Sequence, residues 1–145
     1  MRTKLLDDTD GLRTHAVILE AGDEVMASLD RFARAERVSA ARVSAIGAFR
    51  RAELAYFDWE AKEYRPLPVE EQVEVASLNG DIALDEEGAP ALHLHAVLGR
   101  RDWSALAGHL KSGEVRPTLE ILVTDTPSHL RRVADAASGL ALIRV

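Results

Sequence analysis

The chain has 145 residues, with 18 basic and 24 acidic side chains and a formal net charge of -6 at pH 7. This acidic balance argues against a surface built for nucleic acid or anionic lipid, because both are bound mainly through excess Lys and Arg. The absence of cysteine excludes disulfides and thiolate metal ligands. The length fits one domain, and without a membrane-spanning apolar run or a signal-peptide pattern we expect a cytoplasmic protein.

The first part of the chain predicts one helix among several strands. We assign residues 1–10 to an N-terminal extension that could be flexible, and residues 12–20 to a first strand. Asp23 is a helix-capping residue type, and the apolar residues after it recur at helical spacing. Residues 40–49, which are rich in small side chains, predict a tightly packed strand, and a further strand is expected over 52–59.

Prolines and turn residues divide the middle of the chain. Pro66 and Pro68 lack the N–H that a central strand must donate, which places this part at a sheet edge. A long strand is predicted over 70–78, and the Asn79-Gly80 pair that follows is typical of a tight turn between strands. The acidic segment 85–90 is expected to be an exposed loop.

The C-terminal part predicts strands and a second, short helix. Residues 103–110 could form one helical turn or a short irregular strand, and Gly108 favours the irregular strand; residues 115–125 are expected to form a strand. A Thr-Pro pair suits an N-cap and the first helical position, so a helix is predicted over about 126–134. Residues 139–145 are apolar enough for a central closing strand. The fold class that follows is α+β, a single domain with a mainly antiparallel sheet and about two helices.

Three histidines carry the strongest chemical signal. Alternate side chains of a strand share one face, so His93 and His95 would stand side by side while the leucines around them face the core. His109 follows fourteen residues after His95 and could fold back over the pair. Three neutral imidazoles and one open position suit a transition metal, with zinc as the first candidate. The alternatives are a polar cluster without an ion, or a metal that only holds a loop.

Four motifs together resemble one family. They are Val73-Glu74-Val75-Ala76-Ser77-Leu78-Asn79-Gly80, Leu92-His93-Leu94-His95-Ala96, Ala107-Gly108-His109-Leu110 and Pro117-Thr118-Leu119-Glu120. The chain is similar, over roughly residues 10–145, to the prokaryotic branch of the PPC domain family, the "plants and prokaryotes conserved" domain of unknown function. We therefore assign residues 11–145 to one such domain.

The resemblance implies a compact α+β fold, similar to that of acetolactate decarboxylase, and a homotrimeric assembly. It also implies a metal, usually zinc, on His93, His95 and His109, the trio that spacing suggests independently. DNA binding is a further implication, although this chain has no Arg-Gly-Arg-Pro segment of the kind found in plant members. Two positions depart from the family pattern: Ala107 replaces a glycine before Gly-His, and Trp103 occupies a turn position often held by glycine.

Three functions are consistent with these features. The favoured one is a metal-binding homotrimer of uncertain biochemical role, with water or a small anion in the fourth position of the metal. The second is a zinc-dependent lyase or hydrolase of a small carboxylate or carbonyl compound. Its candidate acid–base residues are Glu120 and Glu74, because each lies inside a predicted strand. Either carboxylate could instead pair with Arg116 or Arg50 at a subunit contact, or face solvent.

The third function is DNA binding or regulation. It would depend on three arginine pairs, at 50–51, 100–101 and 131–132, and the net charge does not favour it. Four aromatic residues could line a ligand pocket, although packing in the sheet or an interface is their commoner role: Tyr56, Phe57, Trp59 and Trp103.

Overall fold

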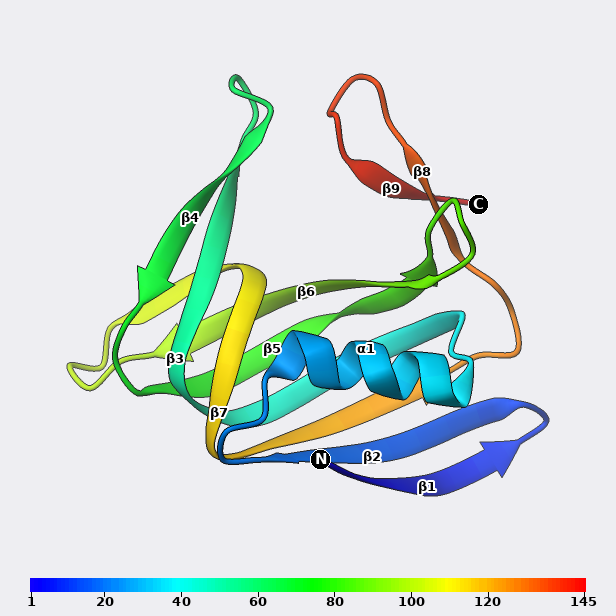
Figure 1. Cartoon of the computed structure of the whole chain (residues 1–145), viewed down its shortest axis with the longest axis horizontal. Coiled ribbons are helices and arrows are strands. Elements are labelled where there is room, and N and C mark those ends of the chain that lie inside the picture. The colour runs from blue at the N-terminus through cyan, green and yellow to red at the C-terminus, as the bar shows by residue number, and fades with distance from the viewer.

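One helix packs across a nine-stranded sheet in the computed structural model of this chain, which describes residues 1–145 (Figure 1). The helix is α1 (Val25–Glu36). The strands are β1 (Arg2–Thr9), β2 (Leu12–Glu20), β3 (Ala40–Asp58), β4 (Glu63–Val69), β5 (Val73–Leu84), β6 (Pro90–Gly99), β7 (Ala105–Asp125), β8 (Arg131–Ala134) and β9 (Ala141–Arg144). Every strand pairing is antiparallel except the short contact of β8 with β5. The predicted α+β class and mainly antiparallel sheet are confirmed, with one helix instead of two.

The long strands β3 and β7 bend and join two parts of the sheet. The first half of β3 pairs with β5 and with the second half of β7. The second half of β3 pairs with β4 and with the first half of β7. Strand β6 pairs with β5 on one side and with the start of β7 on the other. The pairings of β3, β5, β6 and β7 therefore form a closed circuit, which brings β6 and the first half of β7 together.

Helix α1 forms where the sequence predicts it, but its cap differs. Glu24 is the N-cap instead of Asp23: one carboxylate oxygen accepts the Ala27 N–H at 2.7 Å, and the other accepts the Gly113 N–H at 3.1 Å. Asp23 accepts a hydrogen bond from the N-terminal ammonium group at 2.8 Å. Glu24 therefore ties the start of the helix to β7 as well as capping it.

The main core lies between α1 and the sheet. The helix buries one face, and β2, β3 and β7 contribute the alternate residues that face it. The buried side chains are Val25, Leu29, Phe32 and Ala33 from the helix, and Val17, Leu19, Val43, Leu119, Ile121 and Val123 from the strands. This burial favours a helix of only 12 residues, which would be marginal in isolation.

The prediction of a second helix over 126–134 is wrong, because residues Arg131–Ala134 form the strand β8. The N–H and the hydroxyl of Thr126 both donate to the carbonyl of Ala40, at 2.9 and 3.1 Å. The side chain that would cap a helix therefore binds the start of β3, and the segment continues to β8.

Three further sequence predictions are corrected. The Asn79-Gly80 pair is not a turn, because β5 runs through it to Leu84. The short irregular strand predicted over 103–110 is instead the start of one long strand, because β7 runs from Ala105 to Asp125. The closing strand β9 is not central: it lies at the end of the strand order, with three of its four residues exposed. Glycine within a strand can mark a close approach of another backbone, and Gly80 is such a case.

Two outer strands complete the sheet. The segment 1–10, which we separate from the domain, contributes β1, and β1 pairs with β2 alone. The predicted edge position of Pro66 and Pro68 is confirmed, because β4 pairs with β3 alone. Helix α1 is too short and too polar to pass through a bilayer.

Candidate metal centre

His93, His95 and His109 lie together on β6 and β7. His95 is directly opposite His109 in the β6–β7 pairing, and His93 lies two residues along β6. One ring nitrogen from each histidine lies within 4.8 Å of the other two. The Nε2 atoms of His93 and His95 are 3.2 Å apart. Two ligands at about 2.05 Å from a tetrahedral zinc ion are separated by about 3.3 Å, so this group could bind a metal.

Packing on both strands places the rings. Leu94 and Leu98 are fully buried, so the alternating side chains His93 and His95 project from the opposite face of β6. On β7, a Cβ at Gly108 would lie 2.9 Å from the carbonyl oxygen of Ala55, so only glycine allows β7 this close to β3. The leucine alternation predicted from the sequence is therefore what directs the histidines away from the core.

The environment of His93 and His109 favours their neutral form. Burial, together with the positive charges of Arg132 and His95, lowers the pKa of His93 below its usual value. Burial and the neighbouring rings of His93 and His95 lower the pKa of His109 to about 4. Metal ligation requires neutral imidazole, so both rings are in the right form at pH 7.

One buried atom indicates that a partner is needed. The Nδ1 atom of His109 is buried and has no hydrogen-bond partner. A buried polar atom without a partner is costly, and such atoms are rare in folded proteins. A metal ion among the three rings would give the imidazole of His109 the interaction that the protein does not supply. The three residues therefore fit a metal ion.

Two side chains beside the histidines were missed in the sequence analysis as site residues. Arg132 of β8 is 8% exposed and forms an ion pair with Asp81, which lies opposite His93 in the β5–β6 pairing. Tyr64 of β4 packs against His109, with ring centroids 4.7 Å apart and planes inclined by 33°. Both come from strands distant in sequence from β6, so no local spacing could have indicated them. Arg132 was noticed only as half of a basic pair.

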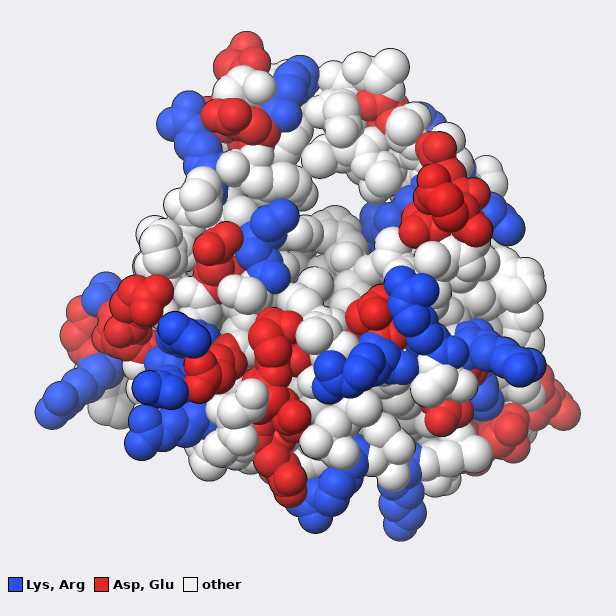
Figure 2. Space-filling model, viewed as in Figure 1, with Lys and Arg blue, Asp and Glu red and all other residues white.

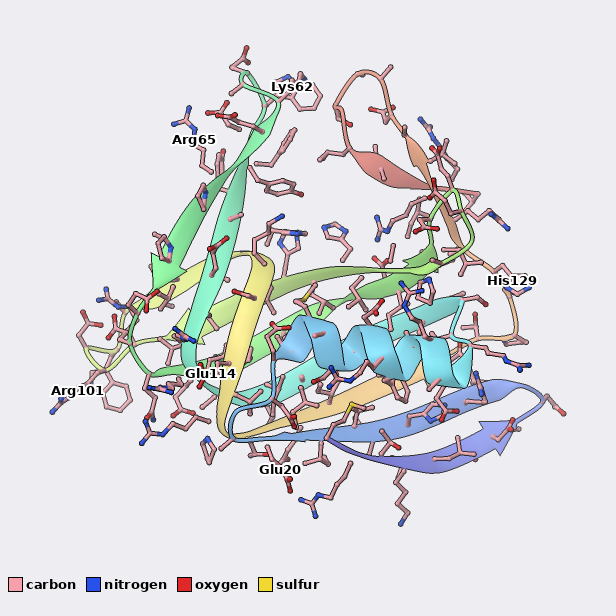
Figure 3. All side chains as sticks on the ribbon, in the orientation of Figure 1. Glu20, Lys62, Arg65, Arg101, Glu114 and His129 are labelled. Atoms are coloured by element: carbon pink, nitrogen blue, oxygen red, sulfur yellow. The ribbon has the colours of Figure 1, made fainter.

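The histidines lie between two arms of the molecule. Strands β3 and β4 form one arm, and β8 and β9 form the other (Figure 1). Tyr64 belongs to the first arm and Arg132 to the second. Figure 2 shows a hollow between the arms, with basic side chains at both margins of its floor. In Figure 3, Lys62 and Arg65 lie on the first arm, while His129 lies on the segment that leads to β8, outside the hollow.

The two predicted acid–base candidates lie elsewhere. Glu74 and Glu120 together line a depression of the sheet that also includes Ile46, and none of the three histidines lines it. Arg50, a suggested partner for them, binds Glu114 instead, at 3.0 Å. The structure brings the two carboxylates near each other but not to the histidines.

Three carboxylates compensate about half of the positive charge of the three arginine pairs. Among their six members, four form ion pairs: Arg50 and Arg51 with Glu114, Arg100 with Glu71, and Arg132 with Asp81. Paired arginines contribute little net positive field, which weakens the case for a basic ring.

Acid is expected to weaken the metal-free protein. The pKa of His109 is 6.5 in the unfolded chain and about 4 in the folded protein, so between these values only the unfolded chain gains the proton. The stabilisation is complete above pH 6.5 and falls as the pH drops towards 4. For a half-buried ring, screened by solvent, we expect the free energy of unfolding to fall by about 1 to 2 kcal/mol between pH 7 and pH 4.5. Urea unfolding at both pH values measures this change in the free energy of unfolding. If His109→Gln lost as much stability as the unmodified chain, the titration of His109 would not be its cause.

Comparison with solved structures gives close relatives. The chain is 32% identical to a metal-containing protein from Archaeoglobus fulgidus, covering 91% of this chain and 93% of that one, with a TM-score of 0.84. It is 28% identical to a plant- and prokaryote-conserved (PPC) protein from Pyrococcus horikoshii, covering 99% and 95% of the chains, with a TM-score of 0.85. A candidate DNA-binding protein from Bacteroides thetaiotaomicron is 27% identical, covering 98% and 96% of the chains, with a TM-score of 0.89.

More distant matches define the limits of the similarity. Acetolactate decarboxylase from Bacillus subtilis is 12% identical, with a TM-score of 0.60 over 86% of this chain and 57% of that one, and shares the fold alone. Among curated proteins, the chain is 29% identical over 134 residues to the bifunctional protein GlmU of Synechococcus sp.. It spans only about a fifth of that relative's length, 20%, while 90% of this chain is covered. Residues 7–127 match the Plants and Prokaryotes Conserved (PCC) domain, and this chain belongs to that family.

Proposed function

We propose that this protein is a metal-binding homotrimer that holds zinc, or another divalent transition metal, on His93, His95 and His109. The observation that carries the proposal is the convergence of three ring nitrogens within 4.8 Å of one another. The donor set contains only imidazoles, which suit zinc and other first-row transition metals better than calcium or magnesium. The description of the A. fulgidus relative as metal-containing supports the same conclusion.

The proposed site leaves one coordination position of the metal open. Three protein ligands leave a tetrahedral ion one position for water or a small anion. When bound, such an ion supplies a Lewis acid that polarises a carbonyl or carboxylate oxygen. A lyase or hydrolase of a small carboxylate or carbonyl compound is therefore the second candidate function, favoured by the hollow between the two arms. The acid–base role of Glu74 and Glu120 stays a prediction, and Asp81 is the carboxylate that lies beside His93.

Metal content tests the proposal. We expect tag-free protein to carry about one transition metal per chain, and His93→Ala to lose it, because two imidazoles no longer enclose the ion. The matched control is His129→Ala, since the ring of His129 also forms a hydrogen bond, to Ser39 at 2.7 Å, but lies away from the hollow. Elemental analysis of the three proteins gives the result. Equal metal content in His93→Ala and His129→Ala would contradict the proposed site.

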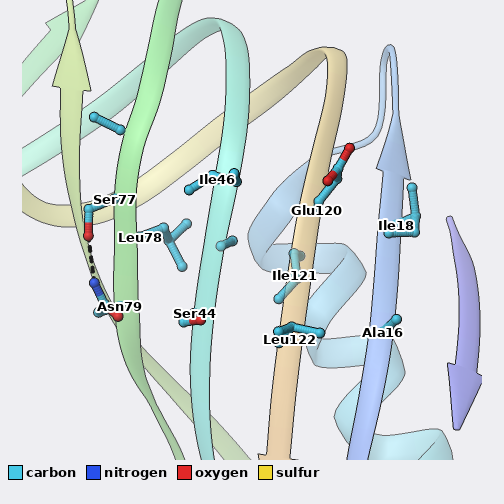
Figure 4. A pocket seen from close by; sticks show the side chains of 12 residues that line it. Ala16, Ile18, Ser44, Ile46, Ser77, Leu78, Asn79, Glu120, Ile121 and Leu122 are labelled. Carbon is cyan, nitrogen blue, oxygen red and sulfur yellow. Dashed lines mark hydrogen bonds between the residues drawn. The ribbon is translucent and has the colours of Figure 1, made fainter. Parts of the chain in front are cut away.

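Trimer formation is proposed through one apolar face of the sheet. Strands β2, β7, β3 and β5 present this face on the side opposite to α1 (Figure 4). Ile46 is 61% exposed and Leu122 49% exposed, and they adjoin Ile18 and Leu78 in one depression. Contiguous exposed apolar surface of this kind marks an interaction site more often than a solvated surface. The family resemblance suggests that its occupants are two further copies of the chain.

A charge placed on this face should prevent assembly. We expect the unmodified protein to have a mass of about 48 kDa, three times the 15.9 kDa of one chain, and Leu122→Arg to be a folded monomer, because a buried unpaired guanidinium is strongly unfavourable. Leu67→Arg, on the edge strand β4 and 44% exposed, is the control that should remain trimeric. Light scattering after size exclusion measures both. A trimer in Leu122→Arg would exclude this face as the interface.

DNA binding is the weaker candidate. Two of the similar solved structures carry that description, but the net charge of -6 and the paired arginines oppose it here. We expect no shift in DNA mobility even at low salt, where electrostatic affinity is greatest. A shift that disappears as salt is added would contradict this expectation and support DNA binding.

A further inference from the structure

We infer that Arg132 binds the anionic group of a ligand that lies above the three histidines, and that the ligand is a small carboxylate with a flat apolar body. This inference rests on the metal site proposed above. It assigns a role to two groups outside the histidines: the buried guanidinium of Arg132 on one side and the aromatic side chains of β3 and β4 on the other.

The first argument is charge balance. Three neutral imidazoles leave both positive charges of a divalent ion uncompensated. Asp81, the carboxylate beside His93, is already paired with Arg132, so together these two residues add no net charge. The site therefore carries a net positive charge in surroundings that are partly buried, where Coulomb attraction is stronger than in bulk water. An anionic ligand is favoured over a neutral one.

The second argument is the state of Arg132 itself. Its side chain is 9% exposed, with Nη2 donating to Asp81 and Nη1 donating to the carbonyl of Ala141 at 3.3 Å. Its Nε atom is buried and has no partner. A guanidinium has five N–H donors, and the planar fork formed by neighbouring nitrogens matches a carboxylate. Arg132 therefore retains donor capacity for a second carboxylate besides that of Asp81.

The position of Arg132 places this capacity at the metal centre. Asp81, to which it is bound, is the cross-strand neighbour of His93. The positive charge of Arg132 also contributes to the lowered pKa of both His93 and His109, as expected of a cation close to both rings. One carboxylate could therefore reach the open metal position and the guanidinium together.

The third argument is the aromatic side of the hollow. Tyr64 packs on His109 at 4.7 Å, Phe57 meets Tyr64 edge-on at 5.3 Å, and Trp59 meets Phe57 edge-on at 6.4 Å. These rings form a row that leads from the histidines along the β3–β4 arm. Aromatic surface of this kind binds flat apolar groups well. A ligand with its carboxylate at the metal and Arg132 can lay its body against Tyr64.

Cobalt(II) provides a direct test, because its visible spectrum reports the coordination of the ion. The full chain is loaded with cobalt(II), its cobalt content is measured, and benzoate or acetate is added. We expect both anions to change the spectrum with saturation, and benzoate to bind more tightly than acetate. Arg132→Gln should weaken benzoate binding by about tenfold or more while the cobalt content stays unchanged, because one charged, hydrogen-bonded partner is lost. Tyr64→Leu should remove the preference for benzoate over acetate.

A second variant separates ligand binding from a purely structural role. If Arg132 only anchors β8 to β5, Asp81→Asn should weaken benzoate binding as Arg132→Gln does, because it breaks the same ion pair. If Arg132 binds the ligand, Asp81→Asn should tighten benzoate binding, since it removes the competing carboxylate. Unchanged affinity in Arg132→Gln, or equal weakening in both variants, would overturn the inference while leaving the metal site intact. Failure of the unmodified chain to retain cobalt would instead refute the metal site, and the inference with it.

Discussion

Gly80→Ala is expected to lower the free energy of unfolding by about 3 to 5 kcal/mol, a loss seen only for severe steric or core defects. A Cβ at this position would lie 1.9 Å from the carbonyl oxygen of His93 and 2.9 Å from the Cα of Leu94. Both contacts are with backbone, so no side chain can move aside and β5 must separate from β6. Leu94 is fully buried, and the separation would open the core directly behind the histidines. Metal content should fall with stability.

Gly99→Ala is the matched control for this prediction. Gly99 lies in β6 and, like Gly80, at the β5–β6 pairing, but a Cβ there would be no closer than 3.7 Å to the neighbouring strand, which is ordinary contact. We expect its effect on the free energy of unfolding to be below about 1 kcal/mol. Urea unfolding followed by circular dichroism compares the two variants. If Gly80→Ala lowered the free energy of unfolding as little as Gly99→Ala, the close approach of β5 and β6 would not contribute to the stability of the fold.

Metal loading is expected to raise the free energy of unfolding by about as much as Gly80→Ala lowers it. Zinc at a free concentration about a thousand times its Kd should raise the free energy of unfolding by about 4 kcal/mol, because the ion binds the folded chain preferentially. The three ligands come from two strands, so unfolding separates His109 from the other two and dissolves the site. For a chain of this size, the midpoint of thermal unfolding should rise by roughly 10 °C.

Two variants define the specificity of that stabilisation. His109→Ala should unfold at nearly the same temperature with and without zinc, because the remaining pair no longer encloses the ion. His129→Ala should retain the full increase. Zinc that stabilised His109→Ala as strongly as the unmodified chain would have to act at another site, and His109 would not be a ligand.

Side-chain alternation made the centre of the site predictable. Apolar residues occupy alternate positions from Leu92 to Leu98, and burial of Leu94 and Leu98 fixes the face on which His93 and His95 appear. The spacing of fourteen residues after His95 suggested that His109 could lie beside the other two histidines, but the sequence could not demonstrate it. It depends on β7 pairing with β6 in one register, with His95 opposite His109. Register between separate strands is a tertiary property, which local pattern does not specify.

The failed predictions share one physical cause. Asn79-Gly80 and Thr126-Pro127 carry strong local turn and helix signals, yet tertiary contacts decide both segments. Gly80 serves the close packing of β5 on β6, and Thr126 binds the carbonyl of Ala40. The same limitation hid Arg132 and Tyr64, because β8 and β4 reach the histidines only through folding of the whole sheet. Glu74 and Glu120 were chosen for their positions inside strands, which does not determine the face they occupy.

Anomalous X-ray diffraction at the absorption edge of the bound metal tests the proposed centre most directly. Crystals of tag-free protein should show one anomalous peak per chain, located about 2.0 to 2.1 Å from a ring nitrogen of each of His93, His95 and His109. A map without a peak among these three rings, from protein that elemental analysis shows to contain metal, would place the ion elsewhere and contradict the proposal.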